Sequence, residues 1–333
     1  MQIQTQYYDI GNIPQTTSLA ERFMFPFSEI NYLVNGGILD RITLITSGTD
    51  NGKSTIASQI LESVIKEGYK AFAFFGEDSW TEARDRLYRQ SAMKEDFNYQ
   101  QYVSINGKNT NCGEYLLSDS KWQEINDFYK GNLYLYNNNI TPDKHNLLAI
   151  LEKAYNENAC RVFLLDNVEM FQLDTDNENA GVKEICIQLR QFAINRKCHI
   201  IVIAHIKKTE RGLIRPDVFD VKGTSTLTNI AKNIITAIRT DKLDKESKEY
   251  KSFKRILELH NWDLDEADGV LEVRKTKGRG YGFCCLKYNH ITNSYYECKK
   301  LSDTQQYKPK SKNKPEQYSL ENLKPVEGED LPF

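Results

Sequence analysis

Residues 42–68 read ITLITSGTDNGKSTIASQILESVIKEG, and this stretch decides the fold. Its apolar start, Ile42–Thr46, predicts a buried strand, and a turn with two glycines follows. Over Ser54–Glu67 the apolar residues recur at helical spacing until Gly68 ends the pattern. A strand, a glycine-containing turn and an amphipathic helix in this order form the context in which phosphate-binding loops occur.

The turn carries the residue types that phosphate binding needs: Ser47, Gly48, Thr49, Asp50, Asn51, Gly52, Lys53, Ser54 and Thr55. Glycines let successive backbone N–H groups curl around phosphate oxygens, and the start of the helix adds a partial positive charge. We expect Lys53 to reach the β- and γ-phosphates of ATP and the Ser54 hydroxyl to hold Mg²⁺. The strict motif has Gly where this chain has Ser47. The alternative is a strand-to-helix turn that contains Gly-Lys-Ser by chance.

Composition excludes several classes of protein. Of 333 residues 40% are hydrophobic and 27% are charged, which is enough apolar sequence for a core and excludes wholesale disorder. No segment approaches the roughly 20 apolar residues that span a bilayer, and the start of the chain does not read as a signal peptide. Seven cysteines without a C-x-x-C pair argue against a disulfide framework or a zinc ribbon. We expect a soluble protein of the bacterial or phage-infected host cytoplasm, whose net charge of −2 leaves room for local basic loops.

From Gly36 to about Thr240 apolar runs alternate with helical periodicity, which predicts βαβ units and a parallel sheet. The predicted strands are Ile42–Thr46, Ala71–Phe75, Leu133–Tyr136, Val162–Asp166, Ile200–Ala204 and Ile234–Ile238. A charged and helical insertion is expected over residues 241–268, and a β-hairpin over Val270–Arg274 and Gly282–Tyr288.

We therefore divide the chain into three parts. Residues 1–30 are assigned to an N-terminal arm, and residues 31–300 to an α/β domain. This domain is expected to have a mostly parallel central sheet flanked by helices and a C-terminal β-hairpin. Residues 301–333 are a polar tail that is expected to be disordered by its composition.

Three polar residues follow successive predicted strands, and the carboxyl ends of parallel strands meet at one edge of a sheet. Glu77 is placed to orient or deprotonate a water that attacks the γ-phosphate, and Asp166 follows a very apolar strand and is expected to help hold Mg²⁺. His205 ends a third strand at the same edge. The alternative for each carboxylate is a helix cap, and for the histidine a structural role. Together they predict one site.

In chain order, the Ser-Gly-x-x-x-Gly-Lys-Ser loop, Glu77, Asp166 and His205-Ile206-Lys207 resemble the RecA-like motor domain of hexameric DnaB-type replicative helicases. The likeness is nearest to the helicase half of phage primase-helicases and of Twinkle, and it covers roughly residues 31–296. The resemblance implies a RecA-like P-loop NTPase that hydrolyses ATP and unwinds DNA. It also implies a ring with ATP between subunits and single-stranded DNA in its channel. In this pattern Glu77 is the catalytic carboxylate and His205 senses the γ-phosphate.

Two basic loops are similar to the DNA-binding loops of that family. The candidate DNA-binding residues are Lys207, Lys208, Arg211 and Arg215 in the first loop, and Lys222 and Gly223 in the second. The alternative is a solvated basic loop without a nucleic-acid partner. Phosphate contacts of this kind carry no sequence preference and weaken with salt.

The turn of the predicted hairpin resembles the Lys-x-Arg element with which the family reaches the neighbouring subunit's ATP. An ungapped match places Lys275 on the lysine and Lys277 on the arginine finger. The chain departs from the family here, because lysine lacks the planar fork that grips a phosphate with two hydrogen bonds. Arg279 and Arg274 are the alternatives for the finger.

With about 30 residues before the motor region and no zinc-ribbon cysteines, we expect a stand-alone helicase that acts in genome replication. The last residues, Glu327–Phe333, resemble the acidic tip of bacterial single-stranded-DNA-binding proteins, which implies a replication-protein partner. An acidic end that only adds solubility is the alternative. Two other functions stay open: a RecA-type recombinase that forms filaments, and a nucleotide-switched scaffold that binds single-stranded DNA and recruits partners through its tail.

Overall fold

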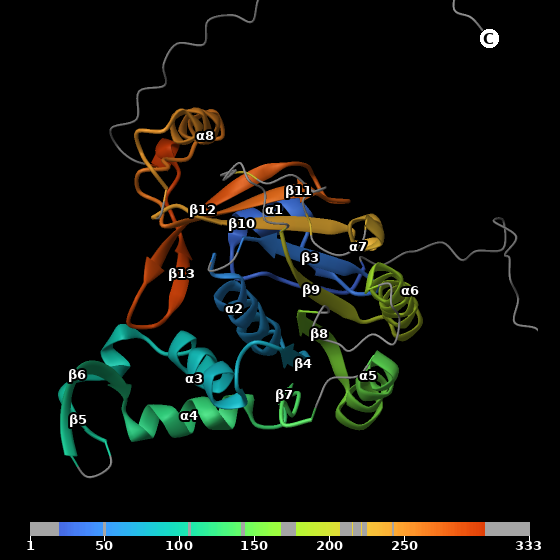
Figure 1. Cartoon of the computed structure of the whole chain (residues 1–333), viewed down its shortest axis with the longest axis horizontal. Helices are drawn as coiled ribbons and strands as arrows, with labels where there is room; N and C mark the ends of the chain where they lie inside the picture. The colour runs from blue at the N-terminus through green and yellow to red at the C-terminus, as the bar shows by residue number, and fades with distance from the viewer. Residues whose placement is uncertain are drawn as a thin grey trace, which may run out of the picture.

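A computed structural model describes residues 20–48, 51–105, 108–140, 144–167, 178–206, 215, 221, 225–241 and 243–303. Its centre is a nine-stranded sheet in the order β13-β12-β11-β10-β3-β9-β8-β4-β7 (Figure 1). The parallel part consists of β10 (Asn233–Arg239), β3 (Ile42–Ser47), β9 (His199–His205), β8 (Cys160–Asp166), β4 (Lys70–Phe75) and β7 (Leu133–Leu135). These strands confirm the six parallel strands and the α/β fold class predicted from the sequence.

The expected hairpin is present but belongs to the main sheet. Strands β11 (Gly269–Lys275), β12 (Gly282–Asn289) and β13 (Ser294–Glu297) form an antiparallel meander. Strand β11 also pairs with β10, so the meander extends the parallel sheet at one edge. Pattern reading predicted the first two of these strands and missed the third.

Helices cover both faces of the sheet (Figure 1). One face carries α1 (Ser28–Val34), α2 (Lys53–Lys66), α3 (Trp80–Gln90) and α4 (Asp119–Tyr129). The other face carries α5 (Lys144–Asn158), α6 (Glu178–Arg196), α7 (Ser225–Ile230) and α8 (Lys248–Leu259). Along β8 the side chains of Val162 and Leu164 enter the first core, and those of Phe163 and Leu165 enter the second. Burial on both faces is the usual state of a parallel strand.

Smaller elements complete the chain. They are the antiparallel pair β1 (Arg22–Phe23) and β2 (Gly37–Ile38), the hairpin β5 (Phe97–Ile105) with β6 (Lys108–Leu117), and the 3₁₀ turns Lys94–Asp96 and Leu301–Asp303. Helix α2 confirms the predicted helix after the glycine turn, and α8 shows that the charged insertion is helical in part. Phe23, Phe25 and Phe27, in the segment assigned to an arm, are buried against the core.

The β5–β6 hairpin was not predicted. It extends away from the central sheet beyond α3 and α4 (Figure 1), and it pairs with none of the nine sheet strands. The exposed rings of Tyr99 and Tyr115 lie 5.1 Å apart between its two strands. Its two strands pair with each other and not with the central sheet, so the pattern of the parallel sheet did not extend to it.

No helix in the part of the chain that the structure describes combines the length and the apolar character needed to cross a bilayer.

His199, at the start of β9, is a fully buried histidine. Its Nδ1 lies 2.7 Å from the Ile38 carbonyl oxygen, and its Nε2 lies 3.1 Å from the Thr43 hydroxyl. The edge of the Phe23 ring covers it, with the ring centroids 5.2 Å apart. Burial lowers the pKa of His199 to about 4. The folded protein therefore keeps this ring neutral at pH values where a solvated histidine is charged.

The free energy of unfolding is expected to fall as the pH drops below 6.5. Below that pH His199 binds a proton in the unfolded chain, whereas in the folded protein it stays neutral down to about pH 4. With a folded pKa of about 4, the loss is about 2 kcal/mol at pH 5 and about 3 kcal/mol below pH 4. Urea unfolding of wild type and His199→Gln at pH 7 and pH 5 measures this contribution. The loss between the two pH values should shrink in His199→Gln and persist in His260→Gln, which changes an exposed ring. An equal loss in all three proteins would contradict the assignment.

Candidate active site

The glycine turn lies where β3 ends and α2 begins. Gly52 is the N-cap of α2 with a φ of +74°, and a Cβ there would lie 2.8 Å from the Tyr295 hydroxyl, so both the backbone and the space favour glycine. Gly52 provides no side chain to cap α2, and no acidic residue stands in the first turn. The first N–H groups of α2 therefore point at a place suited to an anion. Thr49 and Asp50 lie outside the described residues.

Lys53 lies across this turn. Its side chain is buried, and its Nζ donates a 2.8 Å hydrogen bond to the Gly48 carbonyl. The ammonium group thus lies beside the first backbone N–H groups of α2, and both are positive groups suited to phosphate oxygens. The position of Lys53 therefore supports the binding of phosphate oxygens.

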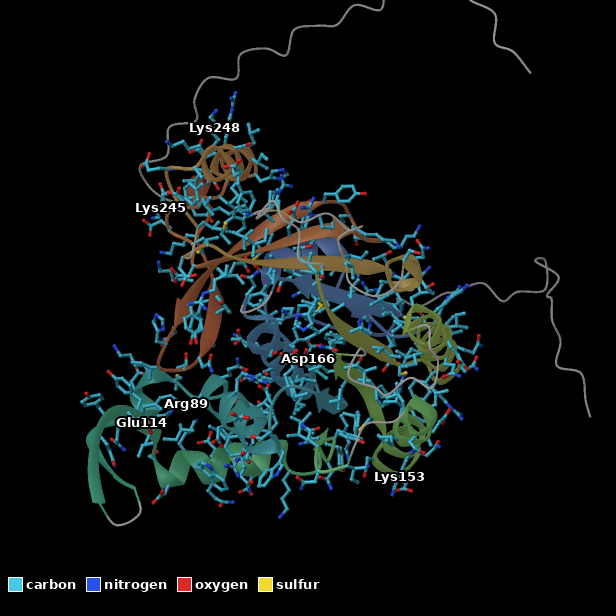
Figure 2. The ribbon with its side chains drawn as sticks, viewed as in Figure 1. Arg89, Glu114, Lys153, Asp166, Lys245 and Lys248 are labelled. Atoms are coloured by element: carbon cyan, nitrogen blue, oxygen red, sulfur yellow. The ribbon has the colours of Figure 1, made fainter. Side chains whose placement is uncertain are left out.

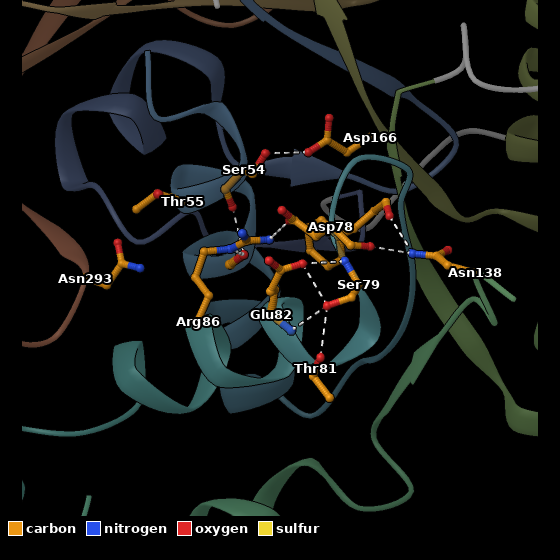
Figure 3. A network of polar contacts seen from close by, with 12 residues as sticks. Ser54, Thr55, Asp78, Ser79, Thr81, Glu82, Arg86, Asn138, Asp166 and Asn293 are labelled. Atoms are coloured by element: carbon orange, nitrogen blue, oxygen red, sulfur yellow. Dashed lines mark hydrogen bonds and ion pairs between the residues drawn. The ribbon is translucent and has the colours of Figure 1, made fainter. Parts of the chain in front are cut away.

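Ser54 and Asp166 form the second part of the site. The Ser54 hydroxyl donates a 2.7 Å hydrogen bond to Oδ2 of Asp166, which lies near the centre of the molecule (Figures 2 and 3). Burial raises the pKa of Asp166, the charge of Glu77 raises it further, and the Ser54 bond and Lys53 oppose the rise. A cation placed between these two oxygens would relieve the cost of a buried carboxylate.

The donor set fits Mg²⁺. This ion prefers oxygen ligands and is usually held by one or two carboxylates together with substrate phosphates. Among the described residues, no group of three or more His, Cys, Asp or Glu side chains forms a metal cage. The Ser54 and Asp166 oxygens would therefore hold the ion jointly with the nucleotide.

Glu77 and His205 form a direct pair. His205 Nε2 lies 2.9 Å from Glu77 Oε1, and the Asn167 amide lies 3.4 Å from the same oxygen. The Glu77 side chain is 59% exposed, so it faces solvent at the mouth of the site. A solvent-facing carboxylate oriented by an imidazole is suited to act on a water molecule.

Strand register explains why these residues meet. Ser47 of β3 is the direct partner of His205 of β9, and the Ile206 N–H donates to the Ser47 carbonyl at 3.2 Å. Phe75 of β4 pairs with Asp166 of β8, and the next backbone N–H, that of Gly76, donates to the Asp166 carbonyl. Four neighbouring strands thus end at one rim of the sheet. The structure confirms the predicted convergence of the glycine turn, Glu77, Asp166 and His205.

Sequence reasoning missed the residues that support this rim. Arg86 of α3 forms a 2.6 Å ion pair with Asp78 and donates a 2.8 Å hydrogen bond to the Ser58 hydroxyl on α2 (Figure 3). The Asn138 amide donates to the carbonyls of Phe75 and Asp78 at 2.8 and 2.6 Å. These contacts brace the turn that carries Glu77. The sequence did contain a local sign of α3, because Ser79 and Glu82 have the spacing of a capping box, which they form at the start of this helix.

A cavity of about 320 Å³ adjoins the first turn of α2. Its lining residues are Gly52, Thr55, Arg239, Asp241, Asp268, Tyr288, His290 and Tyr295. Two hydrogen bonds of 2.7 Å to Asp241 hold the Arg239 guanidinium in place. Guanidinium and aromatic planes stack on flat rings, and carboxylates accept hydrogen bonds from hydroxyl groups. The sequence pattern predicted the start of α2 but no other part of this cavity, because the lining residues come from segments that are far apart in the chain.

Two of the hairpin residues predicted to act in trans, Lys275 and Arg279, make contacts within the chain. Lys275 Nζ donates to the carbonyls of Thr228 at 2.7 Å and Asn229 at 3.2 Å, and burial lowers the pKa of Lys275. The exposed Arg279 guanidinium lies 4.5 Å from the ring centre of Tyr32 on α1. Lys277 is exposed. None of these three hairpin residues lines the cavity beside α2.

Most of the candidate DNA-binding residues lie outside the described residues, namely Lys207, Lys208, Arg211, Lys222 and Gly223. Arg215 is described, and its guanidinium binds the Glu272 carboxylate rather than facing solvent on its own. The acidic tip Glu327–Phe333 also lies outside the described part of the chain.

Comparisons with known proteins agree with this geometry. A family model described as "AAA domain" matches residues 12–211, which is more than half of the chain. No curated protein matches the sequence. A solved structure described as an ATPase domain superposes with a TM-score of 0.61 at 16% identity, over 82% of this chain and 90% of that chain.

Two further solved structures share the architecture. A DnaB-like replicative helicase, described with its interactions with primase, matches with a TM-score of 0.64 at 14% identity over 84% of this chain. This chain covers 64% of that helicase. The KaiC-like protein PH0186 of Pyrococcus horikoshii OT3 matches with a TM-score of 0.55 at 12% identity, over 84% of this chain and 100% of that chain. At such identities the likeness shows a shared fold.

Proposed function

Because the chain belongs to the AAA-domain family, we propose that it is an ATP-hydrolysing DNA helicase that translocates on single-stranded DNA as a ring. One observation carries the proposal: two polar pairs, Ser54 with Asp166 and Glu77 with His205, stand at the rim where the glycine turn ends β3. The first pair suits a metal-bound triphosphate, and the second suits a water that attacks it. The KaiC-like match means that the fold alone does not separate helicases from other ATPases.

In the proposed site, Lys53 and the first N–H groups of α2 hold the phosphates. Ser54 and Asp166 would hold Mg²⁺, which would neutralise charge that builds up on the phosphate oxygens. Glu77 would orient a water toward the γ-phosphate and take its proton as the water oxygen bonds to phosphorus and ADP leaves. His205 holds Glu77 at 2.9 Å and so reports a change in the water or the γ-phosphate to the segment that follows β9.

The cavity beside α2 is the proposed site of the base and ribose. It adjoins Gly52 and Thr55, which flank Lys53 and Ser54 in the chain. Arg239 and the tyrosines supply planes for stacking, and Asp241 and Asp268 supply acceptors for ribose hydroxyls. This arrangement supports the binding of a nucleoside triphosphate.

DNA binding, ring assembly and a phage-like role in replication belong to the same proposal. Lys207, Lys208 and Arg211 follow the sensor His205 directly in the chain, so a nucleotide-dependent shift would reach phosphate contacts made by these residues. Lys222 and Gly223 are proposed to join them, and Lys275, Lys277 and Arg279 are proposed to approach the neighbouring subunit's ATP. A replication-protein partner at Glu327–Phe333 stays a prediction.

Unwinding of a forked DNA duplex tests the function. Strand displacement is expected with ATP and Mg²⁺, and it should vanish with ADP, with EDTA, or on a blunt duplex without a single-stranded tail. ATP turnover without displacement on the fork would favour the nucleotide-switched scaffold. Open filaments instead of closed rings in electron micrographs with nucleotide and single-stranded DNA would favour a recombinase.

A further inference from the structure

Glu272 is a buried carboxylate in the antiparallel part of the sheet. It is 4% exposed and lies in β11, opposite Thr236 of β10 and Phe283 of β12. The cross-strand row continues from Thr236 through Thr46 of β3 to Ala204 of β9. Glu272 is therefore in register with the residues that precede Ser47 and His205 at the rim of the active site.

Two arginines bind this carboxylate. Arg215 uses both Nε, at 3.2 Å from Oε2, and Nη2, which contacts Oε1, so two hydrogen bonds join the two planar groups. Arg274 Nη2 lies 3.2 Å from Oε2. The Arg215 guanidinium also lies 5.5 Å from the ring centre of Phe253 and 5.4 Å from that of Phe283. Aromatic rings remove water from the pair, which strengthens it and fixes its orientation.

The two arginines belong to segments with different proposed tasks. Arg215 lies between His205 and Val221, in the stretch that carries the proposed DNA-binding residues. Ile206 and Val221 close that stretch with an isolated β-bridge. Arg274 precedes Lys275, where β11 leads into the hairpin proposed to reach the neighbouring ATP. A single carboxylate thus connects the DNA-side segment to the subunit-interface hairpin.

We propose that Glu272 is a positioning residue that couples DNA binding to ATP hydrolysis in the neighbouring subunit, through Arg215 on one side and Arg274 on the other. This inference rests on the proposed function. A buried ion pair is a poor source of net stability compared with apolar packing, yet leaving either partner alone in the interior is unfavourable. A displacement of Arg215 on DNA binding would therefore have one of two effects. It would move Glu272 and β11 together with Arg215, or the ion pair would oppose the displacement.

The test compares basal and DNA-stimulated ATPase rates of wild type and Glu272→Gln. We expect the basal ATPase rate of the variant to stay within about twofold of the wild-type rate. Its stimulation by DNA should fall by about 5-fold or more, which is the low end of the usual range of allosteric coupling factors. Its affinity for labelled single-stranded DNA, measured by anisotropy, should stay close to that of wild type. A lower maximal DNA-stimulated ATPase rate together with an unchanged affinity for DNA would point to coupling, because general destabilisation of the fold would reduce both.

Asp265→Asn is the matched control. Asp265 pairs with Lys254 of α8 and accepts a 2.8 Å hydrogen bond from Tyr250, beside the same aromatic cluster, and has no contact with Glu272. It should leave the stimulation intact. If Glu272→Gln fails to fold, as judged by thermal melting, Glu272→Asp performs the same test, because it keeps the charge and draws the carboxylate back by one methylene group from the two guanidinium groups.

The outcomes separate the two claims. Full stimulation in Glu272→Gln, or a basal rate that falls in the same proportion as the stimulated one, would overturn the coupling role alone. Absence of any ATP turnover in the wild-type protein would overturn the proposed function and the coupling role together.

Discussion

Glu77→Gln is expected to stop ATP hydrolysis and to leave ATP bound. The amide keeps the size of the side chain and can form a hydrogen bond to His205, whose Nε2 lies 2.9 Å from Oε1 of Glu77 in the wild-type protein. It cannot accept the proton of the attacking water. General-base catalysis contributes about 10²- to 10⁴-fold, so kcat should fall by that factor while the Kd for ATP changes little.

Single-turnover hydrolysis and fluorescent-nucleotide binding measure the two quantities separately. Glu82→Gln is the matched control, because Glu82 is an acid five residues away whose carboxylate caps α3 rather than facing the glycine turn. It should hydrolyse ATP at the wild-type rate. Wild-type turnover in Glu77→Gln would assign the water to another group and would remove the central role proposed for the pair with His205.

Lys53→Ala is expected to lose ATP binding itself. Lys53 is buried at the start of α2, with Nζ held 2.8 Å from the Gly48 carbonyl, where the phosphates of the nucleotide are proposed to lie. Hydrogen bonds to charged groups contribute about 1.5–3 kcal/mol, which corresponds to roughly 10- to 100-fold weaker binding in the variant. Hydrolysis and unwinding should disappear at ATP concentrations that saturate wild type.

Thermal unfolding with and without Mg-ATP provides the measurement. Wild type should gain stability from the nucleotide, and Lys53→Ala should gain little, because only a ligand bound to the folded state shifts the transition. Lys153→Ala is the control, since Lys153 is an exposed residue on α5 far from Asp166 (Figure 2). An equal ATP-dependent shift in both variants would show that the nucleotide binds elsewhere.

Much of the parallel sheet was predictable because its strands are short apolar runs between helical patterns. Strand β8 is buried on both faces, so its sequence is almost continuously apolar and is easy to recognise. Helix α2 was predicted because its apolar residues recur at helical spacing and the glycine turn marks its start. These elements are encoded within windows of a few residues.

Other elements were missed because their stabilising contacts are distant in the chain. Strand β13 pairs with β12, and the backbone of its Tyr295 exchanges hydrogen bonds of 2.9 and 3.0 Å with the Gln59 amide on α2. The β5–β6 hairpin pairs with no other strand of the described chain, so the pattern of the central sheet did not extend to it.

The candidate site divides in the same way. The types and order of Lys53, Ser54, Glu77, Asp166 and His205 were readable, because each follows an apolar strand or begins a helix. Their pairing was not readable, since it follows from the strand order β3-β9-β8-β4, which differs from the order along the chain. The base cavity and the bracing by Arg86 have the same origin.

By itself, the sequence determined that this chain has a phosphate-binding turn within a parallel α/β sheet, because backbone geometry and burial pattern act over neighbouring residues. Only the tertiary structure decided that Arg215 binds Glu272 instead of standing free beside its basic neighbours. It also decided that Glu77 is held by His205. Contacts of this kind depend on which strands lie side by side, and that choice is made by the packing of the whole core.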